Sequence, residues 1–263
     1  MKEASEKNNR FSRLCFRILR RLVLLFYPKI GIDGLENLPD EPCVIVANHT
    51  QMNGPIACEL YLPNDRAIWC ASPMMYLKEV PAYAYQDFWS AKPKTVRWFY
   101  KLLSYVIAPL SVCVFNNAHT IPVFRDTRLI TTFRRSMERL DEGANVVVFP
   151  ECAQPHNQIV NTFQEKFIEL ARLYYKRTGK ELCFVPMYIA PKLKTMYLGA
   201  PVRYDSKAPA AEERRRICEC MMERITEMAV KLPRHTVVPY SNVPKKQYPM
   251  NIPEGTTCEK TCR

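Results

Sequence analysis

Glycine is scarce in this sequence. Only 7 of the 263 residues are glycine, which is less than half of the usual share of about 7%. No set of them has the spacing of a dinucleotide-binding or P-loop motif, so both kinds of phosphate-cradling loop are excluded. Apolar residues make up an ordinary 48% of the chain, which excludes a largely disordered or collagen-like protein. The sequence therefore predicts a folded protein of one or two domains.

The N-terminal region also lacks the features of secreted or membrane-spanning chains. Residues 1–10 are polar and mixed in charge, and no signal peptide follows them. The longest apolar run in the first thirty residues, Leu22 to Tyr27, is far shorter than the roughly 20 residues that span a bilayer. No pair of C-x-x-C elements is present, so a structural zinc site is not expected. Cysteines within apolar runs, such as Cys43, are typical of a reducing compartment, and we expect a cytoplasmic location.

Acidic residues are the minority, and the basic excess is concentrated at one end. The chain has 38 Lys and Arg against 26 Asp and Glu, a net charge of +12, and half of that excess lies in residues 1–30. Apolar residues in this segment recur at helical spacing, away from the arginines: Phe11, Leu14, Cys15, Ile18, Leu22, Leu25 and Phe26. The pattern predicts a basic amphipathic helix that ends near Pro28 and either packs on the protein's own core or docks on an anionic membrane surface. No nucleic-acid-binding module is recognisable, so nucleic acid is not an expected partner.

Strand and helix patterns alternate along the rest of the chain. Strands are expected at 43–47, 67–71, 119–124, 145–149, 182–189 and 195–198, and helices at 55–62, 129–140, 162–178 and 212–231. Thr162 and Glu165 have the spacing of a capping box. The apolar run 102–115, which contains Pro109, is expected to be a buried helix and strand rather than a membrane span.

This alternation predicts an α/β fold in which a single mixed, partly parallel sheet is flanked by helices, with the amphipathic helix at the N-terminus. We expect three parts: a membrane-docking helix at 1–30, an α/β domain at 31–232, and an extended C-terminal tail at 233–263.

Three predicted strands end in side chains suited to catalysis or binding. Chemistry in open α/β sheets gathers beyond the carboxyl ends of strands. His49 follows the first strand and can act as a general base, because its ordinary pKa of roughly 6.5 lies near working pH. Arg125 follows another, and its guanidinium suits bidentate binding of phosphate or carboxylate. Glu151 follows a third. Taken singly, they could be a helix cap, a surface charge and a solvated carboxylate.

Together and in this order, the motifs resemble those of the glycerolipid acyltransferases, which include the lysophosphatidic acid acyltransferases. That family carries N-H-x-x-x-x-D, a block ending in arginine, F-P-E-G-T-R and an apolar V-P pair. The matching residues here are Asn48-His49, Arg125, Phe149-Pro150-Glu151 and Val185-Pro186. The resemblance covers about residues 44–190.

The resemblance implies acyl transfer from acyl-CoA or acyl carrier protein to the hydroxyl of a (lyso)glycerolipid, such as a lysophospholipid. It implies phospholipid biosynthesis on the cytoplasmic face of a membrane, with no cofactor and no metal. His49 would take the proton from the acceptor hydroxyl, Arg125 would hold the acceptor's phosphate, and Glu151 would orient acceptor or headgroup atoms. The remaining predicted substrate-binding residues are Asn48, Phe149, Pro150, Cys152, Val185 and Pro186, of which the last two shape an apolar wall.

One departure from the family concerns the catalytic histidine. The family's aspartate lies five positions after the histidine, where this chain has Gly54. Without that carboxylate the imidazole lacks its usual tautomer lock. The candidates to replace it are Asn53, Glu59 and a backbone carbonyl, and Asn53 is the one we place in the catalytic set.

A second departure follows Glu151, where Cys152-Ala153-Gln154 replaces the family's G-T-R. The second phosphate-binding arginine is therefore absent. A less anionic acceptor, or another basic residue such as Arg128 or Lys192, would fit equally well. Cys152 itself is either a small residue in a tight turn, a covalent nucleophile, or a metal ligand with His49 and His156.

Two function classes remain open. The chain is either an active acyltransferase or a catalytically impaired relative that binds acyl donors or membrane lipid without turnover.

Overall fold

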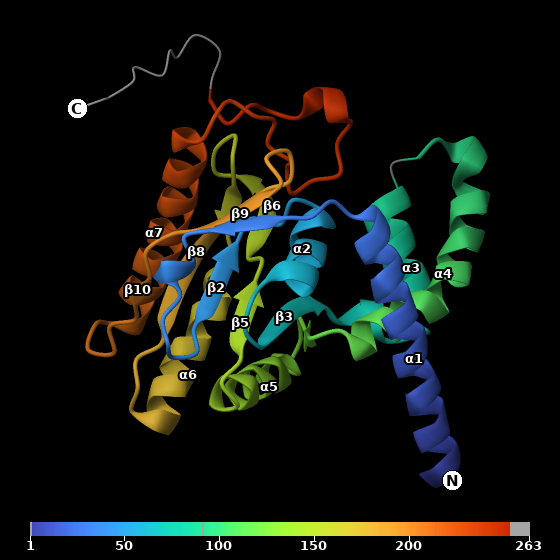
Figure 1. Cartoon of the computed structure of the whole chain (residues 1–263), viewed down its shortest axis with the longest axis horizontal. Coiled ribbons are helices and arrows are strands. Elements are labelled where there is room, and N and C mark those ends of the chain that lie inside the picture. The colour runs from blue at the N-terminus through green and yellow to red at the C-terminus, as the bar shows by residue number, and fades with distance from the viewer. Residues whose placement is uncertain (1, 91, 253–263) are drawn as a thin grey trace. The chain divides into compact units, whose positions relative to one another are not determined.

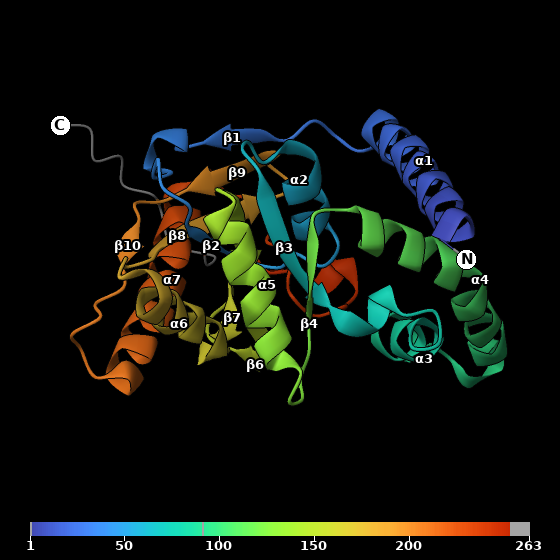
Figure 2. The ribbon, with the colours of Figure 1, turned by 90° about the horizontal axis from the view of Figure 1, so that it is seen from below.

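The computed structural model describes residues 2–90 and 92–252, with side chains from Arg10 onward (Figures 1 and 2). The chain divides into two compact units, each made of two chain segments. Unit 1 comprises Met1–Lys29 and Cys58–Val147, and unit 2 comprises Ile30–Ala57 and Val148–Arg263. The predicted fold class, a single mixed and partly parallel sheet flanked by helices, is confirmed.

Unit 2 contains the strand that delivers His49. Its strands follow the order β1 (Gly31–Asp33), β9 (Thr195–Leu198), β8 (Cys183–Ala190) and β2 (Val44–Ala47), and β10 (Val202–Arg203) pairs with β8. Strand β2 runs parallel to β8, with Ile45 opposite Val185 and Val46 opposite Pro186. Every residue of β2 and β8 is buried, as expected for strands covered on both faces.

Unit 2 also contains helices α6 (Glu169–Thr178) and α7 (Ala210–Lys231), and α7 packs against β8 (Figure 1). A separate two-stranded sheet, β6 (Glu151–Pro155) with β7 (Asn161–Phe163), follows the F-P-E motif. Thr162 lies within β7, so the predicted capping box of Thr162 and Glu165 is wrong. Pairing with β6 outweighs the local helix signal, and a short 3-10 turn, Glu165–Ile168, leads into α6 instead.

Unit 1 contains the other part of the sheet. Its strands are parallel, in the order β5 (Asn145–Val148), β3 (Arg66–Ala71) and β4 (Thr120–Val123). Its helices are α1 (Lys2–Phe26), α3 (Val80–Ala84), α4 (Arg97–Asn117) and α5 (Leu129–Asp141), while α2 (Asn53–Tyr61) begins in unit 2 and ends in unit 1.

Helices α1 and α4 lie side by side in Figures 1 and 2. The Asn117 amide donates to the Ser12 hydroxyl at 2.7 Å, which fixes the two helices to each other. The apolar stripe predicted on α1 is exposed: Phe11 has 67% of its surface exposed and Phe26 has 86%.

Helix α4 corrects the interpretation of residues 102–115. Arg97–Asn117 is one helix with Pro109 inside it, and only Ser104, Ala108 and Ser111 are buried along it. The predicted buried helix and strand are therefore wrong, because Pro109 removes only one N–H donor and the helix continues on both sides of it. Within the described ranges, residues 94–117 are the one helical stretch long and apolar enough, by length and composition, to cross a membrane.

Candidate active site

Asn48 extends the pairing of β2 with β8 through its side chain. Its Nδ2 donates to the carbonyl of Ile189 at 3.1 Å, and its Oδ1 accepts the Ile189 N–H at 2.7 Å. The side chain is buried, so both ends of the amide are satisfied by one backbone residue. Asn48 thus fixes the point at which the chain leaves the sheet and so the position of His49.

His49 opens a tight turn between β2 and α2. Thr50 and Gln51 have positive φ values of 46° and 56°, a conformation that is uncommon for residues other than glycine and unfavourable for β-branched threonine. Asn53 holds this turn, because its backbone N–H and its Nδ2 both donate to the Thr50 carbonyl at 3.1 Å. Strain of this kind gathers at functional sites. Both hydrogen bonds from Asn53 to Thr50 hold the backbone of the turn, and neither reaches the His49 imidazole.

Glu151 holds the main chain of His49. It is 3% exposed; its Oε2 accepts the His49 N–H at 2.5 Å, and its Oε1 accepts the Asn161 N–H at 2.8 Å. Burial raises the pKa of Glu151 to about 7, although both N–H donors oppose that change. The carboxylate therefore joins the turn after β2 to the β6–β7 hairpin, and it acts on the backbone of His49 rather than on the imidazole.

The His49 imidazole contacts two aromatic rings. Its centroid lies 5.2 Å from that of Phe149 and 5.7 Å from that of Tyr240, and both contacts are edge-on. Within residues 2–90 and 92–252, the buried Nδ1 has no hydrogen-bond partner. Burial lowers the pKa of His49 below its ordinary value, opposed by backbone groups of Gln51 and His49. A lowered pKa favours the neutral imidazole, which is the state that a general base requires.

Gly54 leaves no room for a carboxylate side chain at this position. A Cβ built on Gly54 would lie 2.5 Å from the His49 carbonyl oxygen and 3.0 Å from Phe149 Cε1. These two groups occupy the space that a side chain at position 54 would enter. The missing aspartate is therefore tied to the shape of this turn.

The other predicted residues of unit 2 lie along the same strands and hairpin. The Pro150 carbonyl accepts the Gln164 N–H at 2.9 Å, and the Cys152 carbonyl accepts the Asn161 amide at 2.6 Å. Val185 and Pro186 are buried within β8, opposite the strand that carries His49.

Arg125 belongs to unit 1, where it is exposed two residues after β4 ends. Burial raises the pKa of Asp87, and the charge of Arg125 opposes that rise. Arg128, a candidate to replace the missing phosphate-binding arginine, is paired with Asp126 at 2.8 Å and lies over the Phe124 ring. Lys192 is exposed two residues after β8 ends, in unit 2.

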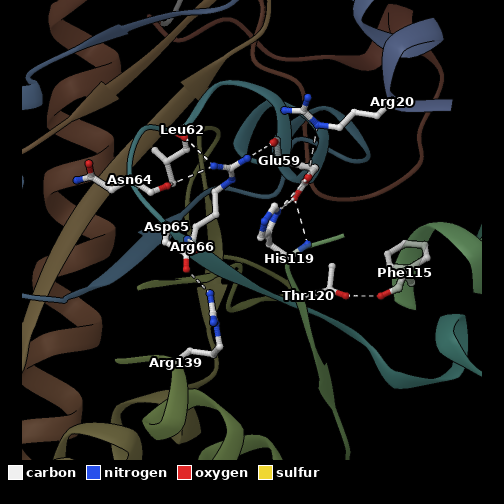
Figure 3. A network of polar contacts seen from close by, with 10 residues as sticks. All are labelled: Arg20, Glu59, Leu62, Asn64, Asp65, Arg66, Phe115, His119, Thr120 and Arg139. Carbon is white, nitrogen blue, oxygen red and sulfur yellow. Dashed lines mark hydrogen bonds and ion pairs between the residues drawn. The ribbon is translucent and has the colours of Figure 1, made fainter. Parts of the chain in front are cut away.

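Glu59, a candidate to orient His49, is paired with His119 in unit 1 (Figure 3). Both carboxylate oxygens lie 3.2 Å from His119 Nδ1, and Arg20 of α1 lies 3.8 Å away. Burial acts to raise the pKa of Glu59, but the hydrogen bonds and charge of His119, with the charge of Arg66, leave it below the ordinary value. The carboxylate is thus committed to a second histidine.

Metal ligation finds no support in the described ranges. Residues 2–90 and 92–252 contain no cluster of three or more His, Cys, Asp or Glu side chains that could hold a metal ion. His156 is exposed at the end of the β6 strand, and its N–H donates to the Val160 carbonyl at 3.3 Å.

No sequence pattern pointed to two residues that lie next to His49, Tyr240 in space and Gln51 in the turn. Tyr240 comes from the segment after α7, for which the sequence shows no periodicity. Gln51 binds that same segment: its Nε2 donates to the Ser241 carbonyl at 3.1 Å and to the Tyr248 hydroxyl at 3.0 Å. Neither contact follows from local pattern, because both join positions about 190 residues apart.

Comparison with known proteins gives a likeness of structure only. No family model matches the chain, and no curated protein sequence matches it. Among solved structures, the chain is similar to the crystal structure of the 1-acyl-sn-glycerophosphate (LPA) acyltransferase PlsC from Thermotoga maritima. The two share 18% sequence identity, with a TM-score of 0.47, over 87% of this chain and 84% of that one. The functional conclusion therefore rests on the residues of the site.

Proposed function

We propose that this protein is an O-acyltransferase that moves an acyl group from a thioester donor to the hydroxyl of a (lyso)glycerolipid. The observation that carries the proposal is the place of His49 at the carboxyl end of β2, where buried Glu151 binds its backbone N–H and burial lowers the pKa of its imidazole. The order of the motifs along the chain adds support, because this histidine is followed by an F-P-E block and then by a buried V-P pair.

The chemistry needs one base and no cofactor. The His49 imidazole takes the proton of the acceptor hydroxyl while the oxygen attacks the thioester carbonyl. The tetrahedral intermediate then collapses, the carbon–sulfur bond breaks, and the thiolate leaves with the proton from the imidazolium. A well-placed general base contributes about 10² to 10⁴ in rate. The products are an ester and a free thiol, as expected for acyl-CoA or acyl carrier protein as donor.

Cationic groups would select the acceptor. Arg125 is exposed at a strand end and suits a phosphate. Of the two cations that could replace the arginine missing after Glu151, Lys192 is exposed, whereas Arg128 is already bound to Asp126. We therefore propose an acceptor with one phosphate or a less anionic headgroup.

The surface of helices α1 and α4 supports a peripheral location on a membrane, at its cytoplasmic face. Large apolar side chains are exposed along both helices: Phe11, Leu14, Ile18, Leu22, Val23, Leu25, Phe26, Trp98, Phe99, Leu102, Tyr105, Val106 and Leu110. The arginines at 13, 17 and 21 are exposed on α1, and no acidic residue lies between positions 10 and 29. Exposed apolar rows beside basic ones suit the interface of an anionic bilayer. Self-association through α1 would instead bring like charges together.

A second candidate function is a lipid-binding relative without turnover. The observation in its favour is the closed space at Gly54, together with the unpartnered Nδ1 of His49. A histidine without a carboxylate partner lacks the hydrogen bond that selects its tautomer, and in the serine protease triad the change of Asp to Asn costs about 10⁴ in rate for this reason.

The two candidates are separated by an acyl-transfer assay. The full chain is incubated with labelled acyl-CoA or acyl carrier protein and a panel of lysoglycerolipids with and without phosphate. We expect product from wild type, a loss of at least about 100-fold in His49→Ala, and little change in His156→Ala, which removes an exposed histidine. Product that persists in His49→Ala contradicts the mechanism. Binding of acceptor or donor without product from any of them supports the second candidate.

A further inference from the structure

The segment after α7 forms a closed loop on unit 2, which we call the C-terminal loop, residues 235–251. Its two ends are joined: the Asn251 N–H donates to the His235 carbonyl at 3.0 Å, and the Val237 N–H donates to the Pro249 carbonyl at 2.8 Å. Thr236 and Met250 form an antiparallel bridge between these bonds. The loop is thus a defined element and not a free strand of chain.

Two buried side chains anchor the ends of this loop. His235 is 5% exposed, and its Nε2 lies 2.8 Å from the hydroxyl of Tyr188 in β8. Asn251 is fully buried; its Oδ1 accepts the His235 N–H, and its Nδ2 donates to the carbonyl of Ala229 at the end of α7. Buried polar groups satisfied in this way hold an element in one arrangement.

The far end of the loop contacts the turn between β2 and α2 that contains His49 and Gln51. Gln51 donates to the Ser241 carbonyl and to the Tyr248 hydroxyl, and the Tyr240 ring meets the His49 imidazole at an interplanar angle of 88°. Phe149 meets the same imidazole at 62°. The imidazole therefore has two rings against it, one from Phe149 in the link between β5 and β6 and one from the C-terminal loop.

We propose that Tyr240 is a positioning residue for His49, and that its ring, with that of Phe149, restrains the imidazole where the related enzymes use a carboxylate. A carboxylate fixes a histidine by a hydrogen bond to Nδ1; two aromatic contacts fix it by occupying the volume into which the ring would rotate. The inference deepens the proposed function, since it assigns the C-terminal loop to the same site.

This arrangement has a chemical consequence for the base. Aromatic neighbours restrain the ring without stabilising an imidazolium by a negative charge, so the neutral form is favoured. The one ionisable group bonded to His49 among the described residues is Glu151, and that bond reaches the backbone N–H. Packing therefore sets both the position of the His49 imidazole and its pKa, and removal of the Tyr240 ring should change both.

The test is a histidine NMR titration, which needs no turnover. The chain has 4 histidines, so ¹³C-labelled imidazole signals can be assigned by single substitutions. We expect a His49 pKa below the ordinary 6.5 in wild type, a rise toward that value in Tyr240→Ala, and restoration of the wild-type pKa in Tyr240→Phe. Lys246→Ala, an exposed residue of the same loop, should leave the signal unchanged.

The signal of buried His235 reports whether the loop stays folded. If it is unchanged in Tyr240→Ala, then a shifted His49 pKa is a local effect. Asn251→Ala, which loosens the anchor, should shift His49 in the same direction as Tyr240→Ala. With substrates that support turnover, Tyr240→Ala should lower kcat on the order of 10- to 100-fold with little change in KM, as expected for a misplaced base.

An unchanged His49 pKa in Tyr240→Ala, with the His235 signal intact, overturns the inference. If the pKa shifts as expected but no variant, including wild type, transfers an acyl group, then Tyr240 positions His49 and it is the proposed function that fails.

Discussion

Gly54 and His49 approach so closely that a methyl group on Gly54 would overlap the His49 carbonyl, at 2.5 Å. The chain therefore reaches its histidine turn in a form that excludes a side chain five positions later. An aspartate placed at position 54 would therefore not reach the His49 imidazole unless the turn itself changed shape.

We predict that Gly54→Asp does not increase acyl transfer and destabilises the fold, and that Gly54→Ala already lowers the free energy of unfolding by about 1–3 kcal/mol through overpacking. Gly31→Ala is the matched control, because a Cβ there would meet its nearest atoms at an ordinary 3.8 Å. Urea unfolding of the three variants measures the effect. A Gly54→Asp protein as stable as wild type and several-fold faster would show that the turn can open.

Asn48→Ala should be among the most damaging single changes in unit 2. It strips both hydrogen bonds from buried Ile189, and unsatisfied buried groups of this kind together cost about 3 kcal/mol. Asn116→Ala is the control, since that amide also donates to backbone carbonyls but is exposed, and we expect a loss below about 1 kcal/mol. Equal losses of stability in the two variants would contradict the role assigned to Asn48.

Glu151 should make stability fall as pH rises from about 4.5 to about 7. Its pKa is raised from 4.5 in the ordinary carboxyl to about 7 in the fold, so the folded protein keeps a proton that the unfolded chain has lost. The contribution is fully present below about pH 4.5 and is lost as pH rises through 7, about 3 kcal/mol in all.

This prediction is tested by urea unfolding across pH 4–8 in wild type and Glu151→Gln. The glutamine variant should be less stable overall, because its amide NH₂ replaces one of the two oxygens that accept N–H groups. It should also lack the decline assigned to Glu151. Identical pH profiles for the two proteins would show that this carboxyl titrates normally.

Charge placed on the exposed face of α4 should release the protein from anionic vesicles. Val106→Glu puts a carboxylate on a side chain that is 67% exposed there, whereas Val230→Glu does so on α7, where the side chain is 42% exposed. We expect a several-fold loss of vesicle binding in a flotation assay for Val106→Glu alone. Equal binding by both variants would exclude α4 from the membrane contact.

Strand β2 before His49, strand β5 before Phe149 and most helices were predictable because their apolar runs are short and bounded by clear breaks. Helix α4 was mistaken because Pro109 suggested a boundary, although one lost N–H does not end a helix. Thr162 was mistaken for a helix cap because its pairing with β6 depends on residues that the local window does not contain.

The composition of the site was less predictable than its location. His49 and Glu151 could be named from sequence, but not that the carboxylate binds the His49 backbone, because that depends on how two strand ends meet. Tyr240 and the closed space at Gly54 depend on contacts across about 190 and about 95 residues, for which no periodicity gives a signal.

The pairing of β2 with β8 has a consequence for synthesis. Val44–Ala47 is wholly apolar, and its parallel partner begins at Cys183, so the strand leaves the ribosome about 140 residues before its neighbour. At about 5–20 residues per second this interval lasts roughly 7 to 28 s. During that time the edge of β2 that pairs with β8 has no partner and is open to aggregation. The yield of soluble protein should therefore depend on chaperones and rise when translation runs at lower temperature.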